Sequence, residues 1–324
     1  PEEGWTEFET TWLITNYLRK LGLSVKVGLA NILPSAVMGR NEATVEQAQQ
    51  RALLNGVPVE FLGELSGYTG AVTEIKTGRP GPITALRFDM DCVPITETVD
   101  PSHIPNCRGF ASERPGLMHA CGHDGHMAMV LEIAKYAKES NYNVLLLFQP
   151  GEEKPGGAKP IIDTQFFKQF NIAAIYGTHI YPELEKGKVY TRSNEMMAGG
   201  CEFEILVKGK ASHAAQPQNG INALTACVEI LQKSLEQEEK AFDNNTFHLL
   251  HFGTFHSGQA FNIIADQAHV RGSIRYYDPK VFDQIVNIIE QNMNNAIKKY
   301  KVQVNFKVNH HYPPVPVSYT HLRA

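Results

Sequence analysis

The sequence lacks several features that would place it in a specialised class of protein. No apolar run approaches the ~18 residues that a membrane-spanning helix needs, and no charged leader with an apolar core opens the chain. Its 5 cysteines are odd in number and widely spaced, which argues against a disulfide framework and for free thiols or a metal ligand. We therefore expect a cytoplasmic protein with no membrane partner.

A basic excess is also missing. The chain has 30 Lys and Arg against 34 Asp and Glu, a formal net charge of −4, so no nucleic-acid partner is expected. What is present is a 43% hydrophobic chain of 324 residues, long enough for a sizeable core and two domains. A small-molecule substrate is the better expectation.

Residues 1–193 carry the pattern of an α/β domain. Apolar positions at helical spacing predict an opening helix over 6–21, and Thr44 with Gln47 forms a capping-box pattern that predicts a helix over 44–54. Four short apolar runs are expected as buried strands, at 71–75, 83–88, 144–148 and 172–176. With a helix over 126–138 between two of them, the pattern predicts a largely parallel sheet.

Residues 194–309 change character and predict a separate α+β domain. The expected elements, in order, are a strand at 201–207, a helix at 221–240, strands at 247–255 and 267–276, a helix at 279–300 and a strand at 302–308. This β-α-β-β-α-β order is the ferredoxin-like signature. The remaining residues, 310–324, form a short Pro-rich tail without a pattern.

The densest chemical signal is the run from His119 to His126, which packs a thiol, three imidazoles and a carboxylate into one loop. Cys121 and His123 are the natural metal pair, because the flanking glycines allow their side chains to point at a common centre. The alternative is a polar loop that caps the following helix, with Asp124 as N-cap.

Acidic and imidazole side chains follow three of the expected strands. Glu152 and Glu153 come after 144–148, His179 comes after 172–176, and an Asp pair, Asp89 and Asp91, comes after 83–88. Open α/β sheets bind ligands beyond the carboxyl ends of their strands. Of two adjacent acids, one can bind metal while the other acts as general base, although a solvated acidic turn is the alternative. The Asp pair could supply ligands or orient a ligand histidine.

Together these motifs resemble subfamily D of the M20 metallopeptidases, which includes hippurate hydrolases, N-acetyl-diaminopimelate deacetylases and plant auxin-conjugate hydrolases. The resemblance implies a zinc-peptidase-like catalytic domain with two divalent ions, Zn or Mn, and an inserted ferredoxin-like lid that mediates dimerisation. Carried over by motif, Glu152 would be the general base. The implied metal ligands are Cys121, His123, Glu153 and His179.

Three residues of the second domain match further positions of that family. His213, in Ala211-Ser212-His213-Ala214, resembles the histidine that polarises the substrate carbonyl, typically of the partner subunit. Asn262 and Arg275 match positions associated with the substrate carboxylate, although a purely structural role is as good an interpretation. The partner implied is a second copy or a related subunit, joined through the lid.

The segment before the first strand narrows the substrate. The stretch from Phe61 to Gly70, with 78–82 and 109–112, is similar to the A-type chain of the aminobenzoyl-glutamate hydrolases. These cleave the amide joining p-aminobenzoate to glutamate. The alternatives are a general N-acyl-amino-acid deacylase and a metal-binding relative without catalysis. The presence of Glu152 favours an enzyme, because a binding relative needs no uncoordinated acid.

The sequence departs from the family at both ends. The family begins with a further helix and a His-rich segment before the position of Pro1, and it returns to the catalytic domain after the lid with one more histidine ligand. That return is not found here, and the stretch from Val315 to Ala324 does not resemble the family. His310, His311 and His321 are not expected to replace the missing ligand.

Overall fold

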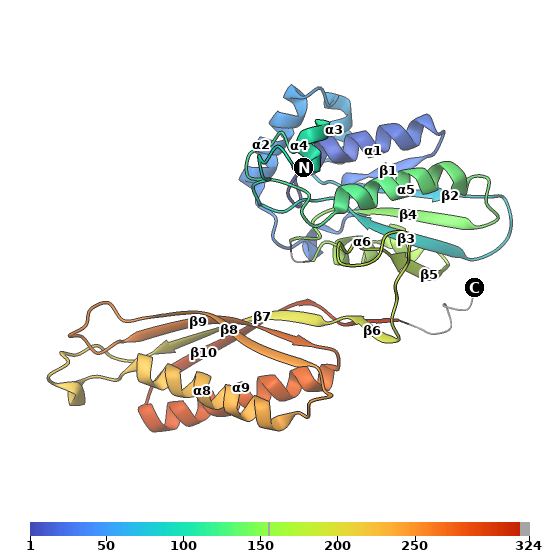
Figure 1. The fold of residues 1–324 in the computed structure, drawn as a ribbon. Helices are drawn as coiled ribbons and strands as arrows, with labels where there is room; N and C mark the ends of the chain where they lie inside the picture. The colour runs from blue at the N-terminus through green and yellow to red at the C-terminus, as the bar shows by residue number, and fades with distance from the viewer. Residues whose placement is uncertain (155, 318–324) are drawn as a thin grey trace. The chain divides into compact units, whose positions relative to one another are not determined.

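The computed structural model describes residues 1–154 and 156–317. The chain divides into two compact units, residues 1–188 and 189–324 (Figure 1). Each unit has its own sheet and its own apolar core, so each is described by itself.

The first unit is built on a five-stranded mixed sheet. In the order in which they pair, its strands are β1 (Val25–Val27), β2 (Ala71–Ile75), β4 (Asn143–Gln149), β3 (Ile83–Asp89) and β5 (Ile172–Gly177). β3 runs parallel to β4 and β5, whereas β2 is antiparallel to both β1 and β4. The expectation of a largely parallel sheet therefore agrees with β3, β4 and β5, and β2 is the strand that departs from it. A buried strand is apolar on both faces whichever way it runs, so its composition does not reveal its direction.

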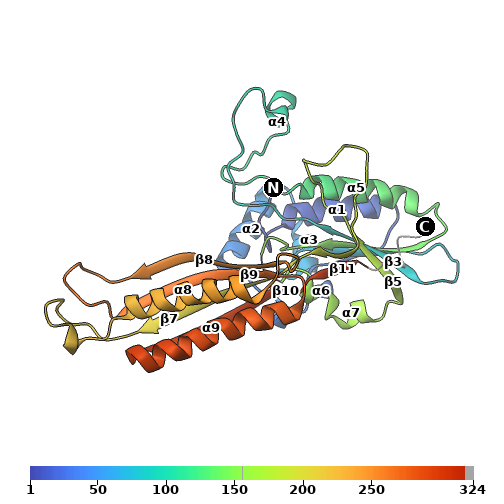
Figure 2. The same cartoon turned by 60° about the horizontal axis from the view of Figure 1, so that its bottom comes forward.

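Helices cover both faces of this sheet (Figures 1 and 2). On one face, α1 (Phe8–Lys20) and α5 (His123–Ala137) pack over alternate strand residues such as Leu146 and Phe148. On the other face, the short helices α6 (Lys159–Ile162) and α7 (Gln165–Lys168) bring Phe166 and Phe167 towards Leu145 and Leu147. Successive residues of β4 point to opposite faces, and because they are all apolar from Val144 to Phe148, both faces of the strand are apolar.

Smaller elements complete the first unit. They are the helices α2 (Glu42–Leu54), α3 (Val59–Leu65) and α4 (Ile104–Arg108), and the 3₁₀ turns η1 (Gly28–Asn31) and η2 (Pro34–Ala36). α4 lies in a loop that projects from this unit (Figure 2). Asn41 caps α2 by accepting a hydrogen bond from the Thr44 backbone N–H at 3.2 Å, so the expected cap at Thr44 is wrong by three residues.

The second unit has a four-stranded antiparallel sheet with two helices on one face. The strands pair in the order β10 (Gln303–Tyr312), β7 (Gly199–Lys208), β9 (Gln267–Tyr276) and β8 (His248–Ser257). The helices are α8 (Ala223–Ala241) and α9 (Pro279–Tyr300), with a 3₁₀ turn, η3 (Pro217–Asn219), before α8. Along the chain the order is β-α-β-β-α-β, as the alternation and helical periodicity predict.

The end of the described chain is more regular than expected. β10 continues to Tyr312, and a short strand β11 (Val315–Val317) pairs antiparallel with β6 (Asn194–Met197). The expectation of a tail without pattern from residue 310 is therefore wrong up to residue 317. Pairing with distant strands makes this stretch regular, and local sequence does not reveal such pairing. His321 lies outside the described residues. Within residues 1–154 and 156–317, no helix is both long and apolar enough to cross a membrane.

Candidate metal centre

The three parallel strands of the first unit end at one edge of the sheet and bring the chemical groups together. Asp89, the last residue of β3, pairs with Gln149, the last residue of β4, and β5 ends beside them at Gly177. The loops that leave these strands carry the acid pair after β4 and His179 after β5. The edge predicted from the sequence is therefore the edge that the fold forms.

His123 lies at the centre of this group. It is the first residue of α5 and is fully buried, and Gly122 before it adopts φ +82°, a left-handed conformation that favours glycine. The helix begins three residues earlier than expected and its N-cap is Gly122, so the alternative in which Asp124 caps it is wrong.

Four carboxylates surround the His123 ring. Its Nδ1 lies 3.4 Å from Asp91 Oδ1, and its Nε2 lies 3.7 Å from Asp89 Oδ2. The same Nε2 lies 3.7 Å from Glu153 Oε1 and 3.9 Å from Glu152 Oε2. Burial lowers the pKa of His123, but the adjacent Asp91 carboxylate and the surrounding negative charge outweigh it, so the net shift is upward.

Cys121 and His179 complete the cluster from the side of β5. The Cys121 Sγ lies 3.3 Å from the His179 Nε2. Burial, together with Glu153 and Glu152, raises the pKa of the Cys121 thiol to about 12. A thiol in such acidic surroundings becomes a thiolate only when a cation is bound beside it.

The donor atoms present fit a divalent cation. Three overlapping groups bring their donor atoms within 4.8 Å of one another: Cys121 with His123 and His179, Asp89 with His123 and His126, and His123 with Glu152 and Glu153. Several atoms in and beside these groups are buried and have no hydrogen-bond partner among the described residues: both ring nitrogens of His123, Glu153 Oε1 and the neighbouring Asp91 Oδ1. Buried polar atoms are normally paired, and a bound cation would pair these.

The two acids of the turn after β4 differ in their surroundings. The Glu153 backbone N–H donates to Asp91 Oδ2 at 2.9 Å, and the Oε1 atom of the Glu153 carboxylate is buried. Glu152 is more exposed, at 38% of its side chain against 25% for Glu153. Burial and the nearby carboxylates raise the pKa of Glu152, and Arg87 opposes them. Glu152 can therefore meet a ligand from solvent while its neighbour faces His123.

His126 acts as a clamp between two loops of the site. Its Nε2 accepts a hydrogen bond from the Ile180 N–H at 2.9 Å, so its Nδ1 carries the proton and donates to Asp89 Oδ1 at 2.6 Å. Although burial opposes it, this bond and the charge of Arg87 hold the pKa of Asp89 at about 2. The Asp89 signal was visible in the sequence, whereas the roles of His126 and Arg87 were not.

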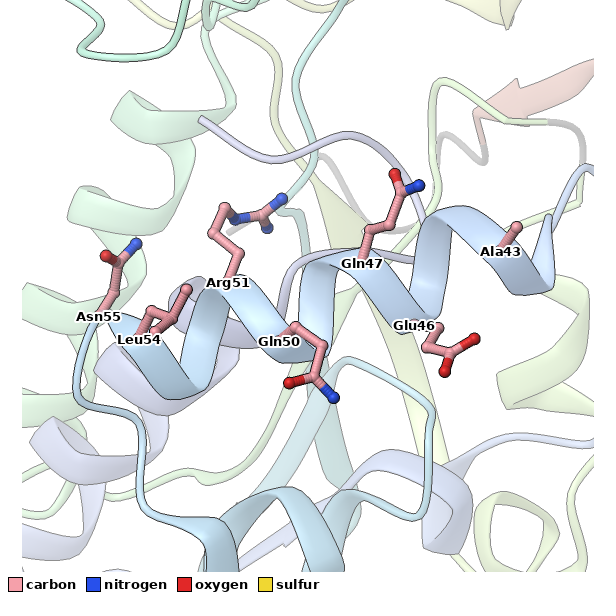
Figure 3. Close-up of a pocket in the computed structure, with 7 residues that line it drawn as sticks. All are labelled: Ala43, Glu46, Gln47, Gln50, Arg51, Leu54 and Asn55. Atoms are coloured by element: carbon pink, nitrogen blue, oxygen red, sulfur yellow. The ribbon is translucent and has the colours of Figure 1, made fainter.

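One hollow of the first unit lies elsewhere and is no substrate site. Its volume is about 570 Å³, and it shares no residue with the metal-ligand cluster. All seven lining residues come from α2 and its C-cap, and Figure 3 shows Gln47 and Arg51 pointing to one side of the helix and Glu46 and Gln50 to the other. A hollow over one helix lacks the converging polar groups of a ligand site.

The sequence-predicted residues of the second unit fall into two places. His213 forms a β-bridge with Ile263, and the Ala214 N–H donates to the Asn262 carbonyl at 2.9 Å, so His213 and Asn262 are neighbours and both are exposed. Arg275 lies at the far end of β9 and donates to the Tyr312 hydroxyl at 2.6 Å. At ~3.3 Å per residue, β9 separates it from the other two by more than about 25 Å, so one chain does not bring the three together.

Comparison with known proteins assigns the family. The model of Peptidase family M20/M25/M40 matches residues 85–321, so the expectation that the stretch from Val315 does not resemble the family is wrong up to residue 321. The A chain of the p-aminobenzoyl-glutamate hydrolase from Escherichia coli (strain K12) is 32% identical over 314 residues, which cover 95% of this chain and 71% of that protein.

Two further proteins agree with this assignment. The N-acetyldiaminopimelate deacetylase of Listeria monocytogenes serotype 4a is 32% identical over 262 residues, or 80% of this chain and 69% of that protein. The crystal structure of the Bacillus subtilis YxeP protein, described as a dinuclear metal binding peptidase from the M20 family, shares the fold with a TM-score of 0.71 at 24% identity, covering 99% of this chain and 73% of that one. The chain therefore belongs to Peptidase family M20/M25/M40 and is a metallo-amidohydrolase or peptidase of that family.

Proposed function

We propose that the protein hydrolyses the amide bond of p-aminobenzoyl-glutamate or a similar N-acyl amino acid. One observation carries the proposal: a partly exposed carboxylate, Glu152, lies beside the donor cluster around the buried His123 without being enclosed by it, with its Oε2 3.9 Å from His123 Nε2. That is the place a general base needs, next to the ligands and open to the substrate.

Cys121, His123, Glu153 and His179 would hold two divalent ions, Zn or Mn. A thiolate and imidazoles suit zinc, and a carboxylate suits either metal. When bound, such ions supply Lewis-acid polarisation of a carbonyl oxygen and of a water molecule. Asp91, which faces His123 Nδ1, would orient that ring and keep its Nε2 directed towards the cluster.

Glu152 would carry the proton through the reaction. Its carboxylate accepts a proton from the attacking water and returns it to the nitrogen of the amide as the C–N bond breaks, so the acyl group leaves as a carboxylic acid and the amino acid as an amine. The raised pKa of Glu152 suits the first step, because a stronger base takes the proton more readily.

The second unit would serve as lid and dimerisation domain, in a homodimer or a heterodimer with a related subunit. In this proposal His213 polarises the substrate carbonyl of the partner subunit, while Asn262 and Arg275 bind the substrate carboxylate. The exposure of His213 and Asn262 side by side supports this, since both can reach a ligand outside their own unit. The separation of Arg275 from them agrees with a site completed by two chains.

A general N-acyl-amino-acid deacylase is the second candidate. It is favoured by the equal identity, 32%, to a chain of an aminobenzoyl-glutamate hydrolase and to a deacetylase of N-acetyldiaminopimelate. A non-catalytic metal-binding relative is the third candidate. Glu152 argues against it, because a protein that only binds metal needs no uncoordinated acid beside the ligands.

One screen separates these candidates. The protein is loaded with Zn²⁺ or Mn²⁺ and offered p-aminobenzoyl-glutamate, hippurate and N-acetyl-diaminopimelate, with Glu152→Gln as matched control. We expect release of p-aminobenzoate at the highest kcat/KM, and no release by the control. Preference for hippurate or the acetyl substrate would establish the general deacylase, and hydrolysis of none of the three would contradict the proposal. The cytoplasmic location stays a prediction.

A further inference from the structure

A buried carboxylate far from the metal-ligand cluster in sequence contacts the turn that carries the acid pair. Glu7, just before α1, is fully buried. Its Oε1 accepts a hydrogen bond from the Gly151 backbone N–H at 2.8 Å, and its Oε2 accepts from the Thr69 hydroxyl at 2.6 Å. Burying a carboxyl group lowers the stability of the folded state unless the group is hydrogen-bonded, so the two hydrogen bonds of Glu7 are part of what allows its burial.

Two carboxylates hold the turn from both sides of Glu152. Glu7 takes the N–H of Gly151, and Asp91 takes the N–H of Glu153 at 2.9 Å. Glu152 lies between the two fixed amides, so its backbone position is set by acceptors that are themselves buried. Because the backbone amides on both sides of Glu152 are held in place, its side chain can move only by changing rotamer.

The N-terminal segment also packs against the back of this turn. Gly151 has φ +60°, and a Cβ atom there would lie 2.8 Å from Cε2 of the buried Trp5 ring. The close approach fixes Gly151 over the indole, and the hydrogen bond from its N–H to Glu7 fixes its orientation. Packing and hydrogen bonding therefore act on the same peptide.

We propose that Glu7 is a positioning residue for the acid turn, setting the reach of Glu153 to the metal and of Glu152 to the substrate. This inference rests on the proposed function for its consequence in catalysis, but its structural part stands on the contacts above. The chain offers a matched control in Glu2, another buried acid of the same segment. Glu2 accepts from the Thr10 N–H at 2.7 Å and from Arg51 at 2.6 Å, so its hydrogen bonds tie α1 to α2 and not to the turn.

The test separates the length of the Glu7 side chain from its ability to ionise. Glu7→Gln keeps the length, so its amide oxygen can accept from Gly151 and its NH₂ can donate to the Thr69 hydroxyl. Glu7→Asp keeps the carboxyl group but withdraws it by about 1.5 Å, the length of one C–C bond. Glu2→Asp makes the same chemical change at the control position. Each variant is measured by hydrogen exchange of the peptide spanning 151–153, and by calorimetric titration with Zn²⁺ alone.

We expect Glu7→Asp to speed exchange at 151–153 and to weaken Zn²⁺ binding about 10-fold, the scale of losing an outer partner of a metal ligand. Glu7→Gln should bind Zn²⁺ within about 3-fold of the wild-type affinity, a smaller change than the loss of about 10-fold expected for Glu7→Asp. Glu2→Asp should lower the melting temperature without changing the exchange at 151–153 or the Zn²⁺ affinity. Wild-type exchange and affinity in Glu7→Asp, or equal losses in Glu2→Asp, would overturn the inference. Failure of the proposed function is distinguishable, because a wild type that binds Zn²⁺ but hydrolyses no amide leaves these readouts intact.

Discussion

The Nδ1 of His126 lies 2.6 Å from the Oδ1 of Asp89, and both groups are buried. This pair joins the end of β3 to the first turn of α5. Because His126 Nε2 also accepts the Ile180 N–H, the pair reaches the loop that carries His179. Three elements that supply the metal-ligand cluster are thus fixed to one another by a single imidazole.

Loss of this clamp should weaken metal binding without removing a ligand. In His126→Leu, Asp89 loses the hydrogen bond from the imidazole and keeps Arg87 and His123 nearby, and the Ile180 N–H loses its acceptor. We expect Zn²⁺ affinity to fall about 10- to 100-fold, as for other residues that orient ligands, with unchanged stoichiometry. Calorimetric titration gives both quantities. Asp124→Asn, an exposed change in the same turn of α5, is the control, and equal affinity in the two variants would remove the clamp from the account.

Cys121→Ala should lower the number of divalent ions bound per chain. The thiolate is the one sulfur donor of the three donor groups, and alanine offers no replacement. Elemental analysis after dialysis measures the stoichiometry. Cys107→Ala changes an exposed thiol outside these groups and should bind as the wild type does. Unchanged metal content in Cys121→Ala would defeat its assignment as a ligand.

His213→Ala should reduce turnover while leaving metal content intact. If the imidazole polarises the substrate carbonyl, its loss should cut kcat by roughly 10²-fold or more. His256, an exposed histidine on β8, provides the control substitution His256→Ala. Steady-state kinetics with p-aminobenzoyl-glutamate decide the matter, and equal kcat in both variants would take His213 out of the mechanism.

The acid Glu7 should make stability depend on pH. Burial, with the negative charge of Asp91 added, raises the pKa of Glu7 from 4.5 to about 8. Between these values the folded protein binds a proton that the unfolded chain has released, so the stabilising contribution is full below about pH 4.5 and is lost as the pH rises through 8. Glu7→Gln removes this titration. Its free energy of unfolding relative to the wild type should therefore rise between pH 5 and pH 8.

Urea unfolding of the metal-free proteins at both pH values provides the measurement. Glu238→Gln is a positive reference, because burial also raises the pKa of this carboxyl of the second unit, so its difference from the wild type should change in the same direction. A difference between Glu7→Gln and the wild type that stays constant from pH 5 to pH 8 would contradict the role of burial at Glu7.

Much of the fold was predictable because local pattern decides it. α9 has the predicted bounds, since Asp278 and Pro279 start an amphipathic helix, and β2 has them because an apolar run ends in a turn. The direction of β2 was not predictable, because pairing with β4 depends on residues about 70 positions away in the chain. α3 was missed because its seven residues include Gly63 and are too few for a periodic signal.

The candidate site divides in the same way. Strand ends locate the acid pair and His179, since parallel strands β3, β4 and β5 finish at one edge. The contacts of His126 with Ile180 and of Glu7 with Gly151 join segments far apart in the chain, and no spacing rule predicts them. The sequence therefore predicts which residues could bind metal better than it predicts which residues hold them.

The central claim is the division of labour between Glu152 and Glu153, and paired substitutions test it most directly. Glu152→Gln keeps size and metal but cannot accept the proton of the attacking water, so kcat should fall by at least ~10²-fold with KM little changed. Glu153→Gln should lose metal as well as rate. The measurement is kcat and metal content of both variants in parallel. If Glu152→Gln loses metal and Glu153→Gln retains it, the two roles are exchanged; if neither loses turnover, the pair is a solvated acidic turn and the mechanism is wrong.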